Sequence, residues 1–564
     1  MKLILVALNF DDSPEAIPLG AACIASALKK ALQVELVSTD VAHATEMHEV
    51  LHKSIAQGFR QNDVCALGFS LYCWNRAASL HLAQAAQEIN AEAGKLFLFC
   101  GGPEATANSS GLSKAEGGPF DAVIQGEGEE AAIRLIAGLL GRNSPEPTSF
   151  LSSLSSLSSL SSPWLDGTLS VKRGSAVLWE LARGCPFRCA YCYESKGANS
   201  LRYYPMERIK AELQVFIQRD AAYVSVLDPT FNADPKRASQ MLDLIIKEQS
   251  RRDNGTQWHF EARAELVTEA QAMHFAELGA SVQIGLQTSN PAAASLLDRG
   301  WNREKFLKGI ALLNRYDVSF GLDLIYGLPG DDIKGFKKSL DFALGLQPNN
   351  LDIFRLAVLP GTTLHERAGQ LGIEADTEAP YLVQSTPSFD AESLDRAEKL
   401  AELTDIFYNQ GKAVGWFLQV YQALRDFHNS RTMHALPDFH TADLIEQFGA
   451  FLEAEKISRE DVFCNNSSVD IPQVQCRFFA QCCNQLAVPQ LIPAIEDLIH
   501  YHAGWARALT EGKSTMLSLH YHPQEIFGRE GLKLKAFIKH HKQSPAHWHM
   551  DTEGELSPVS KKIF

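Results

Sequence analysis

The residues with the clearest chemistry are three cysteines, Cys185, Cys189 and Cys192. They lie in the run Arg183-Gly184-Cys185-Pro186-Phe187-Arg188-Cys189-Ala190-Tyr191-Cys192-Tyr193. Their spacing is C-x3-C-x2-C, with an aromatic residue directly before the last thiolate. Four thiolates saturate a [4Fe–4S] cluster, whereas three leave one iron open to bind and activate a small molecule. The spacing therefore predicts a metal cluster with an open coordination position.

Zinc and disulfide formation are the alternative interpretations of these cysteines. A zinc site usually repeats a C-x2-C pair or adds two His at fixed spacing, and no matching fourth ligand lies nearby. A disulfide framework suits short secreted chains rather than 564 residues with 11 scattered cysteines. The iron–sulfur interpretation is therefore preferred.

The cysteine triplet resembles the signature of radical S-adenosylmethionine (SAM) enzymes, and further motifs in the chain support this interpretation. The resemblance covers roughly residues 175–370 and extends to the oxygen-independent coproporphyrinogen oxidase branch of that family. It is carried by His259-Phe260-Glu261-Ala262-Arg263, by Ile284-Gly285-Leu286-Gln287 with the later Arg299, and by Leu322-Asp323-Leu324-Ile325-Tyr326-Gly327-Leu328-Pro329-Gly330.

The resemblance implies a SAM site with assigned roles. Glu261 and Gln287 would hydrogen-bond the SAM ribose, and Asp323 would make a ribose or other polar contact. Arg299 would pair with the SAM carboxylate, a bidentate match that Lys could not copy. The adenine would meet the backbone at Tyr191 and Gly327. A plain ion pair between Glu261 and Arg299, and a Gln287 that only satisfies buried backbone groups, are the alternatives.

One position departs from the family pattern. Many radical SAM enzymes carry a glycine-rich run after the second strand, and this run receives the SAM amino group. Here the place holds Leu227-Asp228-Pro229-Thr230. By this likeness Asp228, or neighbouring backbone carbonyls, would accept the ammonium group instead.

The elements that position these residues follow a strand–helix alternation. Each predicted strand runs into a loop of special residues, which is where βα barrels gather their chemistry. Six such units predict an open, partial (β/α)6 barrel, a radical SAM core over residues 170–375. The expected strands are Ala176–Glu180, Tyr223–Leu227, Gln257–Ala262, Val282–Leu286, Phe320–Ile325 and Leu351–Ala357.

A second alternation precedes this one, over residues 1–140, with helical stretches at Pro18–Ala31 and Ala77–Ala93. Alternation of this kind predicts a doubly wound, Rossmann-like parallel sheet that binds ligands at the carboxyl ends of its strands. The expected strands are Leu3–Leu8, Val34–Val37, Val64–Ser70, Leu96–Phe99 and Ala122–Ile124.

The loops of this first domain resemble the cobalamin (B12)-binding domains of B12-dependent radical SAM proteins, in a subfamily with an uncharacterised C-terminal domain. The likeness lies in Pro18-Leu19-Gly20-Ala21-Ala22, Gly101-Gly102-Pro103-Glu104, Gly126-Glu127-Gly128-Glu129 and the run from Phe69 to Asn75. It implies cobalamin contacts from Ser70, Gly101, Gly102, Pro103, Glu104, Gly126, Glu127 and Gly128. No Asp-x-His-x-x-Gly loop is present, so we expect no His lower ligand, with Tyr72 or Trp74 as candidates to shield that face. A flavodoxin-like domain without this cofactor is the alternative.

The remaining segments carry no motif of known mechanism. Residues 141–163 contain a Leu-Ser-Ser repeat, and this composition predicts a poorly ordered low-complexity linker. Residues 380–564 are predicted to form a mainly helical C-terminal domain, with strand-like runs at Met516–Tyr521 and Lys533–Ile538.

Composition limits the partners of the chain. The net charge of −15 argues against binding nucleic acid or anionic lipid. The apolar start, Met1–Leu8, is too short for a membrane span and is expected to be a buried strand. Free thiols and an oxygen-sensitive cluster suit a reducing cytoplasm.

Together these features predict a cobalamin-dependent radical SAM enzyme that uses a [4Fe–4S] cluster, SAM and cobalamin. The resemblance implies reductive cleavage of SAM to a 5′-deoxyadenosyl radical and methyl transfer to an unactivated carbon. The substrate would be a small molecule or peptide-derived, and a flavodoxin- or ferredoxin-like protein would donate low-potential electrons. Radical cyclisation or rearrangement without methyl transfer, and a non-catalytic iron–sulfur and corrinoid sensor, are the alternatives.

Overall fold

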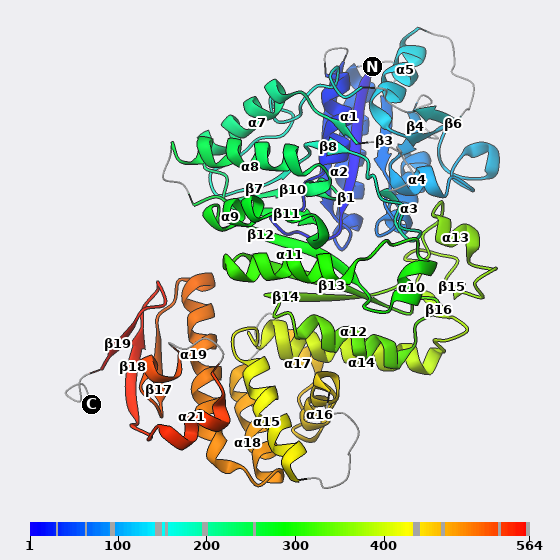
Figure 1. Ribbon diagram of the computed structural model, residues 1–564. Helices are drawn as coiled ribbons and strands as arrows, with labels where there is room; N and C mark the ends of the chain where they lie inside the picture. Colours follow the sequence, from blue (N-terminus) through cyan, green and yellow to red (C-terminus); the bar gives the residue numbers. More distant parts are fainter. Residues whose placement is uncertain are drawn as a thin grey trace. The chain divides into compact units, whose positions relative to one another are not determined.

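A computed structural model describes most of the chain in two compact units (Figure 1). Unit 1 comprises residues 1–284, 292–319 and 356–387, and unit 2 comprises residues 285–291, 320–355 and 388–564. The described residues are 1–29, 32–61, 65–90, 96–141, 149–152, 156–194, 201–251, 255–431, 440–463, 469–527 and 532–559.

The N-terminal part of unit 1 is a parallel six-stranded sheet, as the alternating pattern predicts. Its strands are β1 (Lys2–Asn9), β2 (Gln33–Asp40), β3 (Cys65–Ser70), β4 (Leu96–Gly101), β5 (Ala122–Gly126) and β6 (Ser149–Ser152). Their order is β2-β1-β3-β4-β5-β6, and every neighbouring pair is parallel. The predicted strand start Val64 lies outside the described residues.

Helices cover both faces of this sheet. They are α1 (Leu19–Leu28), α2 (Ala44–Gln61), α3 (Arg76–Asn90), α4 (Pro103–Ala107) and α5 (Gly128–Leu140), with the short turn η1 (Lys114–Glu116). Alternate residues of β1 explain the two layers, because side chains along a strand point to opposite faces. Ile4 and Val6 belong to one core with α2 and α3, whereas Leu3 and Leu5 belong to another with α1 and α5. The doubly wound architecture is therefore confirmed.

A second set of parallel strands follows. Unit 1 contains the order β12-β11-β10-β7, made of β7 (Ala176–Trp179), β10 (Tyr223–Val226), β11 (Gln257–Ala262) and β12 (Ser281–Gln287), the last of which continues into unit 2. In unit 2, β13 (Ser319–Tyr326) pairs in parallel with β14 (Asn350–Arg355). Six parallel strands separated by helices agree with the expected fold class.

The helices between these strands begin at identifiable caps. They are α7 (Met206–Gln218), α8 (Pro235–Gln249), α9 (Glu269–Glu277), α10 (Pro291–Leu296), α11 (Arg303–Arg315) and α12 (Ile333–Leu344), with the turns η2 (Phe231–Ala233) and η3 (Ala264–Leu266). Asp234 caps α8, Thr268 forms a capping box on α9, and Asn302 caps α11. These side-chain oxygens satisfy backbone N–H groups that the first helical turn leaves without partners.

Unit 1 is completed by shorter elements around the cysteine loop. A two-stranded antiparallel ribbon consists of β8 (Ala182–Arg183) and β9 (Arg202–Tyr203). Residues 356–387 contain α13 (Thr363–Arg367), β15 (Glu374–Ala375) and β16 (Val383–Ser385).

The predicted linker is more ordered than its composition indicates. Ser149–Ser152 form β6 and extend the first sheet by pairing with β5. Leu157 is buried, and the Ser162 hydroxyl donates to Glu212 Oε1 at 2.5 Å. Residues 142–148 and 153–155 of this segment lie outside the described residues.

The C-terminal part of unit 2 is mainly helical, as expected. Its helices are α14 (Ala391–Thr404), the π-helical turn η4 (Asp405–Gln410), α15 (Phe417–Arg431), α16 (Thr441–Ala454), α17 (Arg459–Phe463), α18 (Ile471–Gln485), η5 (Pro489–Leu491), α19 (Ile492–Glu511), α20 (Pro523–Ile526) and α21 (Leu534–His540). An antiparallel sheet of β17 (Thr515–Leu519), β18 (Ala546–Met550) and β19 (Leu556–Pro558) follows α19.

One expectation for this region is wrong. Lys533–Ile538 is not a strand, because these residues begin α21. Leu534 and Phe537 are both buried, three positions apart, which is the spacing of one helix face. The alternation of this short run could not distinguish the two structures.

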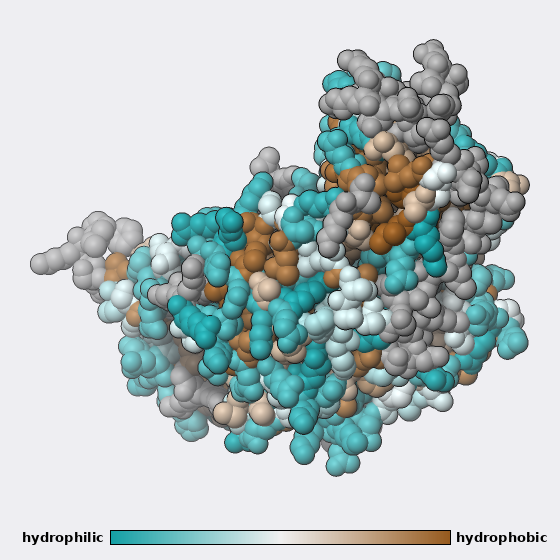
Figure 2. Space-filling model, turned by 90° about the horizontal axis from the view of Figure 1, so that it is seen from above, coloured by the Kyte–Doolittle hydropathy of each residue, from teal (hydrophilic) through white to brown (hydrophobic). Residues whose placement is uncertain are grey.

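Among the described residues, several large apolar side chains are exposed, including Phe10, Trp74 and Phe354. Hydrophilic residues cover much of the face shown in Figure 2, and apolar residues are exposed in a few places. Within the described residues, no helix combines the length and apolar character needed to cross a bilayer.

Candidate active site

The cysteine loop follows β7 and β8 in unit 1, and its middle is held by the backbone. The Ala190 N–H donates to the Leu297 carbonyl at 2.8 Å, and the Ala190 carbonyl accepts from the Leu364 N–H at 2.8 Å. Cys189 is buried between these contacts, whereas Cys185 and Cys192 are partly exposed. Segments distant in sequence therefore fix the loop before any ligand binds.

Burial makes the outer thiols weak acids. It raises the pKa of Cys185, and it raises the pKa of Cys192 to about 11. Ligation of metal by thiolates must therefore displace protons from these groups. Among the described residues, no three His, Cys, Asp or Glu side chains are grouped as ligands of a single metal ion. A [4Fe–4S] cluster differs from such a site, since each thiolate binds its own iron.

Two arginines lie at the cysteine loop. Arg299 is 8% exposed, and its Nη1 donates to Cys189 Sγ at 3.8 Å. The Arg263 guanidinium lies 3.9 Å from the centre of the Phe187 ring and donates from Nη2 to the Gly300 carbonyl at 3.0 Å. The two positive charges suit an anionic thiolate-bound cluster or the carboxylate of a ligand.

Two further predicted SAM residues lie in unit 1. Glu261 is exposed near the end of β11, and its strand partner is Gln283 on β12. The residues on either side of Glu261 are buried, so the carboxylate lies on the open face of the strand. Tyr191 lies near Cys189 and Arg299, and burial raises the pKa of its phenol. Unit 1 thus brings Tyr191 and Arg299 to the cysteine loop.

Asp228 is placed differently from a free ligand. It is buried after β10, and its Oδ1 accepts the N–H groups of Leu181 and Ala182, both at 2.9 Å. These two residues begin the approach to the cysteine loop. Burial raises the pKa of Asp228 to about 7. Its visible role is to support the chain ahead of Cys185, and a contact with the SAM ammonium stays a prediction.

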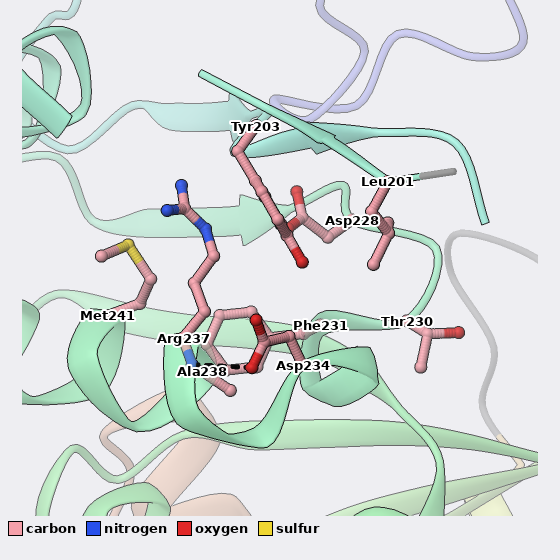
Figure 3. A pocket seen from close by; sticks show the side chains of 9 residues that line it. All are labelled: Leu201, Tyr203, Asp228, Thr230, Phe231, Asp234, Arg237, Ala238 and Met241. Atoms are coloured by element: carbon pink, nitrogen blue, oxygen red, sulfur yellow. Dashed lines mark hydrogen bonds between the residues drawn. The ribbon is translucent and has the colours of Figure 1, made fainter. Parts of the chain in front are cut away.

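A small pocket lies next to Asp228 (Figure 3). One wall carries Tyr203, whose ring lies 4.1 Å from the Arg237 guanidinium carbon. The lining residues are Leu201, Tyr203, Asp228, Thr230, Phe231, Asp234, Arg237, Ala238 and Met241. The pocket therefore presents acidic, basic and aromatic side chains beside β10.

The other predicted SAM residues lie in unit 2. Gln287 ends β12 with a positive φ of 68°, and its Oε1 is buried without a hydrogen-bond partner among the described residues. Asp323 is half-buried on β13, with Asp352 as its strand partner. Gly327 follows β13 with a φ of 79°, a conformation that favours glycine.

A buried network that the sequence reasoning missed supports these loops of unit 2. Asp331 accepts from Asn290 Nδ2 at 3.0 Å and from the Thr288 hydroxyl at 3.3 Å. The Ser339 hydroxyl accepts the Ser289 N–H at 2.9 Å. The network joins the loop after Gln287 to the loop after Gly327. The charged residue directly after Gly-Leu-Pro-Gly was the available sequence signal.

The predicted cobalamin residues gather at the carboxyl ends of three adjacent strands. Ser70 ends β3 opposite Gly101 of β4, and Gly126 ends β5. Gly102 has a φ of 110°, and a Cβ there would lie 2.6 Å from the Leu71 carbonyl oxygen. Pro103 and Gly128 begin α4 and α5. The sheet therefore provides a backbone surface that a bulky ligand could approach closely.

The two predicted acidic ligands of cobalamin contact protein groups of unit 1. Glu104 is 4% exposed, lies 3.1 Å from Arg76 Nη1, and accepts the hydroxyl of Tyr381. Glu127 lies 2.7 Å from Arg202 Nη1 and 3.2 Å from Arg183 Nη1. The sequence shows the two carboxylates beside the glycines, but it does not show which arginine and tyrosine side chains they contact.

Aromatic side chains lie at the same edge of the first sheet. Tyr72 and Trp74 stack with ring centres 4.3 Å apart directly after β3. Trp74 is 43% exposed, and Phe10, directly after β1, is 74% exposed. Exposed rings at strand ends suit a large, partly apolar ligand such as a corrin.

Comparison with known proteins agrees with both predicted cofactor domains. Residues 11–136 match the B12 binding domain, and residues 179–343 match the radical SAM superfamily. The chain is 23% identical over 387 residues to the 2-(S-pantetheinyl)-carbapenam-3-carboxylate methyltransferase of Streptantibioticus cattleyicolor, covering 61% of this chain and 54% of the relative. It is also 23% identical over 380 residues to the cobalamin-dependent radical SAM methyltransferase TokK of Streptomyces tokunonensis, with the same coverage.

A solved structure shows a similar fold over most of the chain. The cobalamin-dependent SAM radical enzyme OxsB, with aqua-cobalamin and SAM bound, aligns with a TM-score of 0.54 and 13% identity. The alignment covers 95% of this chain and 83% of OxsB. The chain spans about half the length of the two curated methyltransferases that it matches.

The fold and the two domain matches define the class: a B12-binding domain followed by a radical SAM domain. The chain thus combines a match to the B12 binding domain with a match to the radical SAM superfamily.

Proposed function

We propose that the protein is a cobalamin-dependent radical SAM methyltransferase that methylates an unactivated carbon of a small-molecule or peptide-derived substrate. The observation that carries this proposal is the contact between the two predicted cofactor sites within unit 1. Arg183 lies two residues before Cys185 and binds Glu127 and Glu129, which flank Gly128. A cluster on the cysteine loop and a corrinoid at the strand ends would therefore be neighbours.

The residues present fit the three cofactors. Cys185, Cys189 and Cys192 would hold the cluster, Arg299 would bind the SAM carboxylate, and the strand-end glycines would admit cobalamin. Arg263 Nε and Gln287 Oε1 are a buried donor and a buried acceptor without partners among the described residues. Leaving such a group unpaired is costly, so within each unit a polar ligand that pairs with the group there would be favoured.

The bound cofactors supply the radical chemistry and the methyl group, and the protein binds, orients and shields them. In this chain the arginines hold anionic groups, while Glu261 and Asp323 offer acceptors to ribose hydroxyls. Two relatives named as methyltransferases support methyl transfer over cyclisation or rearrangement. A flavodoxin- or ferredoxin-like electron donor completes the proposal, and nucleic acid is not proposed as a partner.

The test is anaerobic reconstitution with iron, sulfide and cobalamin, followed by SAM, a strong reductant and nucleoside analysis by mass spectrometry. 5′-Deoxyadenosine together with S-adenosylhomocysteine supports the methyltransferase proposal. 5′-Deoxyadenosine alone favours cyclisation or rearrangement. Neither product, from protein with full cofactor loading and no SAM-induced change in the cluster's electron paramagnetic resonance (EPR) spectrum, contradicts the proposal.

A cysteine variant tests the separation of the two cofactor sites. Cys189→Ala should abolish cluster assembly, measured as bound iron, and leave cobalamin absorbance intact. Cys482→Ala, at a buried cysteine of α18, is the matched control and should retain both cofactors. Loss of cobalamin from Cys189→Ala alone would contradict separate sites.

A further inference from the structure

We infer that Glu104, Glu127 and Glu129 are docking residues that hold the glycine loops of the B12-binding domain to the radical SAM domain and to the segment 356–387, and that Arg183 is the positioning residue of the contact with the radical SAM domain. The inference rests on the proposed function, because it concerns the spacing of the two cofactor sites. It assigns the cofactor contacts of these loops to the backbone and the carboxylates to the protein.

The first contact is a partly buried ion-pair cluster. Arg183 lies 2.7 Å from Glu129, 3.2 Å from Glu127 and 3.0 Å from Glu180. Its guanidinium thus serves three carboxylates at once, which requires the fixed fork of an arginine. The Tyr204 hydroxyl donates to Glu180 Oε2 at 2.7 Å and adds a further donor.

The ribbon of β8 and β9 places two arginines at this contact. Arg183 and Arg202 are directly paired across β8 and β9. Like charges opposite each other destabilise a strand pair unless an acid lies between them. Glu127 is that acid, because its two oxygens contact both arginines. The ribbon therefore gains part of its charge balance from the B12-binding domain, beside the contribution of Glu180.

The second contact is at the other glycine loop. Tyr381, from the 356–387 segment, donates its hydroxyl to Glu104, and Asn108 Nδ2 donates to the same hydroxyl at 3.1 Å. Tyr381 is 2% exposed and has a φ of 60°, which a bulky residue adopts only when its surroundings hold it. Glu104 is also paired with Arg76 of its own domain, so its charge is compensated.

In both loops the glycine backbone faces the predicted cofactor site, and the neighbouring carboxylate contacts protein groups. Gly102 and Gly126 have positive φ values of 110° and 82° and present backbone at the strand ends. The adjacent carboxylates contact groups outside the B12-binding domain: Glu127 pairs with Arg183 and Arg202 of the radical SAM domain, and Glu104 accepts the hydroxyl of Tyr381 from the segment that follows that domain. Loosening either contact should change the distance between the cofactors before it changes the binding of either one.

The first test uses the full-length chain without cofactors. Arg183→Gln and Tyr381→Phe should each speed amide hydrogen exchange by about fivefold or more, in peptides of 126–136 and 103–108 respectively. Arg315→Gln removes an exposed ion pair with Glu269 in the same unit and should leave both peptides unchanged. Unchanged exchange in both test variants, with native circular dichroism, would overturn the inference.

The second test separates docking from cofactor binding. Glu127→Gln should bind cobalamin within about twofold of the wild-type affinity. It should weaken the EPR-detected magnetic coupling between cob(II)alamin and the reduced cluster, and raise the ratio of 5′-deoxyadenosine to S-adenosylhomocysteine. A loss of cobalamin affinity of about tenfold or more, with unchanged hydrogen exchange, would make Glu127 a cofactor ligand and the inference wrong. If the wild-type chain binds no cobalamin, the proposed function fails while the exchange experiment still tests the docking contacts.

Discussion

At the scale of single residues, the cysteine loop combines three thiols with two guanidinium groups. Arg299 points to Cys189, while Arg263 stacks on Phe187 within the loop. A cluster of three thiolates and a zwitterionic SAM would bring negative charge to both arginines. The loop is therefore electrostatically prepared for these ligands, although burial raises the pKa of the Cys185 and Cys192 thiols and metal must displace their protons.

Replacement of Arg299 by Lys should weaken SAM binding by about tenfold to a hundredfold, because one ammonium cannot reproduce a bidentate contact with a carboxylate. Isothermal titration of the cluster-loaded protein with SAM measures the change. Arg315→Lys, at an exposed arginine of the same unit, should bind SAM normally. Equal affinities of the two variants would remove Arg299 from the SAM site.

Asp228 makes the stability of the cofactor-free chain depend on pH. Its pKa is raised from 3.8 to about 7 by burial, so the folded state keeps a proton that the unfolded state has lost between these values. The free energy of unfolding should therefore fall, by up to a few kcal/mol, as the pH rises from about 4 to about 7, and level off above. Apparent melting temperatures across this range measure the effect. Asp228→Asn keeps an acceptor for Leu181 and Ala182 and should flatten the dependence; an unchanged slope would refute the assignment.

At the scale of elements, the site depends on where parallel strands end. Ser70, Gly101 and Gly126 are far apart in sequence, but they end neighbouring strands of one sheet. The pattern of short apolar runs predicted these strands to within a few residues. It failed at Lys533–Ile538, where a six-residue run fits a strand and a helix equally well, and at β6, where Ser-rich composition concealed a strand that joins an existing edge.

Gly102 should be hard to replace, because both its backbone conformation and its surroundings exclude a side chain. An alanine there would place its Cβ 2.6 Å from a backbone oxygen at a φ of 110°. We expect Gly102→Ala to lower the free energy of unfolding by more than about 2 kcal/mol and to impair cobalamin binding. Gly111 has a φ of 70° and open space around it, so Gly111→Ala should cost only about 1 kcal/mol. Denaturant melts and cobalamin titrations compare the pair, and equal effects would mean that the close approach is unimportant.

At the scale of the whole molecule, the helical region of unit 2 completes a sheet edge. The Asn409 side chain hydrogen-bonds the backbone of β14 as a neighbouring strand would. Its Nδ2 donates to the Leu351 carbonyl and its Oδ1 accepts the Leu351 N–H, both at 3.0 Å. The Tyr408 hydroxyl donates to the Pro348 carbonyl at 2.8 Å. These contacts cover β14, which would otherwise present free backbone groups.

Removal of residues 388–564 should therefore yield aggregated protein, because β14 loses its cover. Size-exclusion chromatography of the truncated chain tests this.

Within the full chain, Asn409→Ala should lower the free energy of unfolding by about 1–3 kcal/mol, since two buried backbone groups lose their partner. Asn484→Ala, at an exposed asparagine of α18, should have little effect. A monomeric, folded truncation would show that the C-terminal region is dispensable for the core.

The sequence alone predicted the class of this protein and the order of its two domains, because thiol spacing, glycine-rich loops and strand–helix alternation are local properties of the chain. It could not determine what the side chains beside those motifs contact. Glu104 and Glu127 follow the predicted cofactor loops, yet Tyr381, Arg183 and Arg202 engage them from positions far away in sequence. Asp228 likewise supports the approach to the cysteine loop through two backbone N–H groups. Such pairings arise only when the chain folds, since burial leaves each charged group with the partners that packing brings to it.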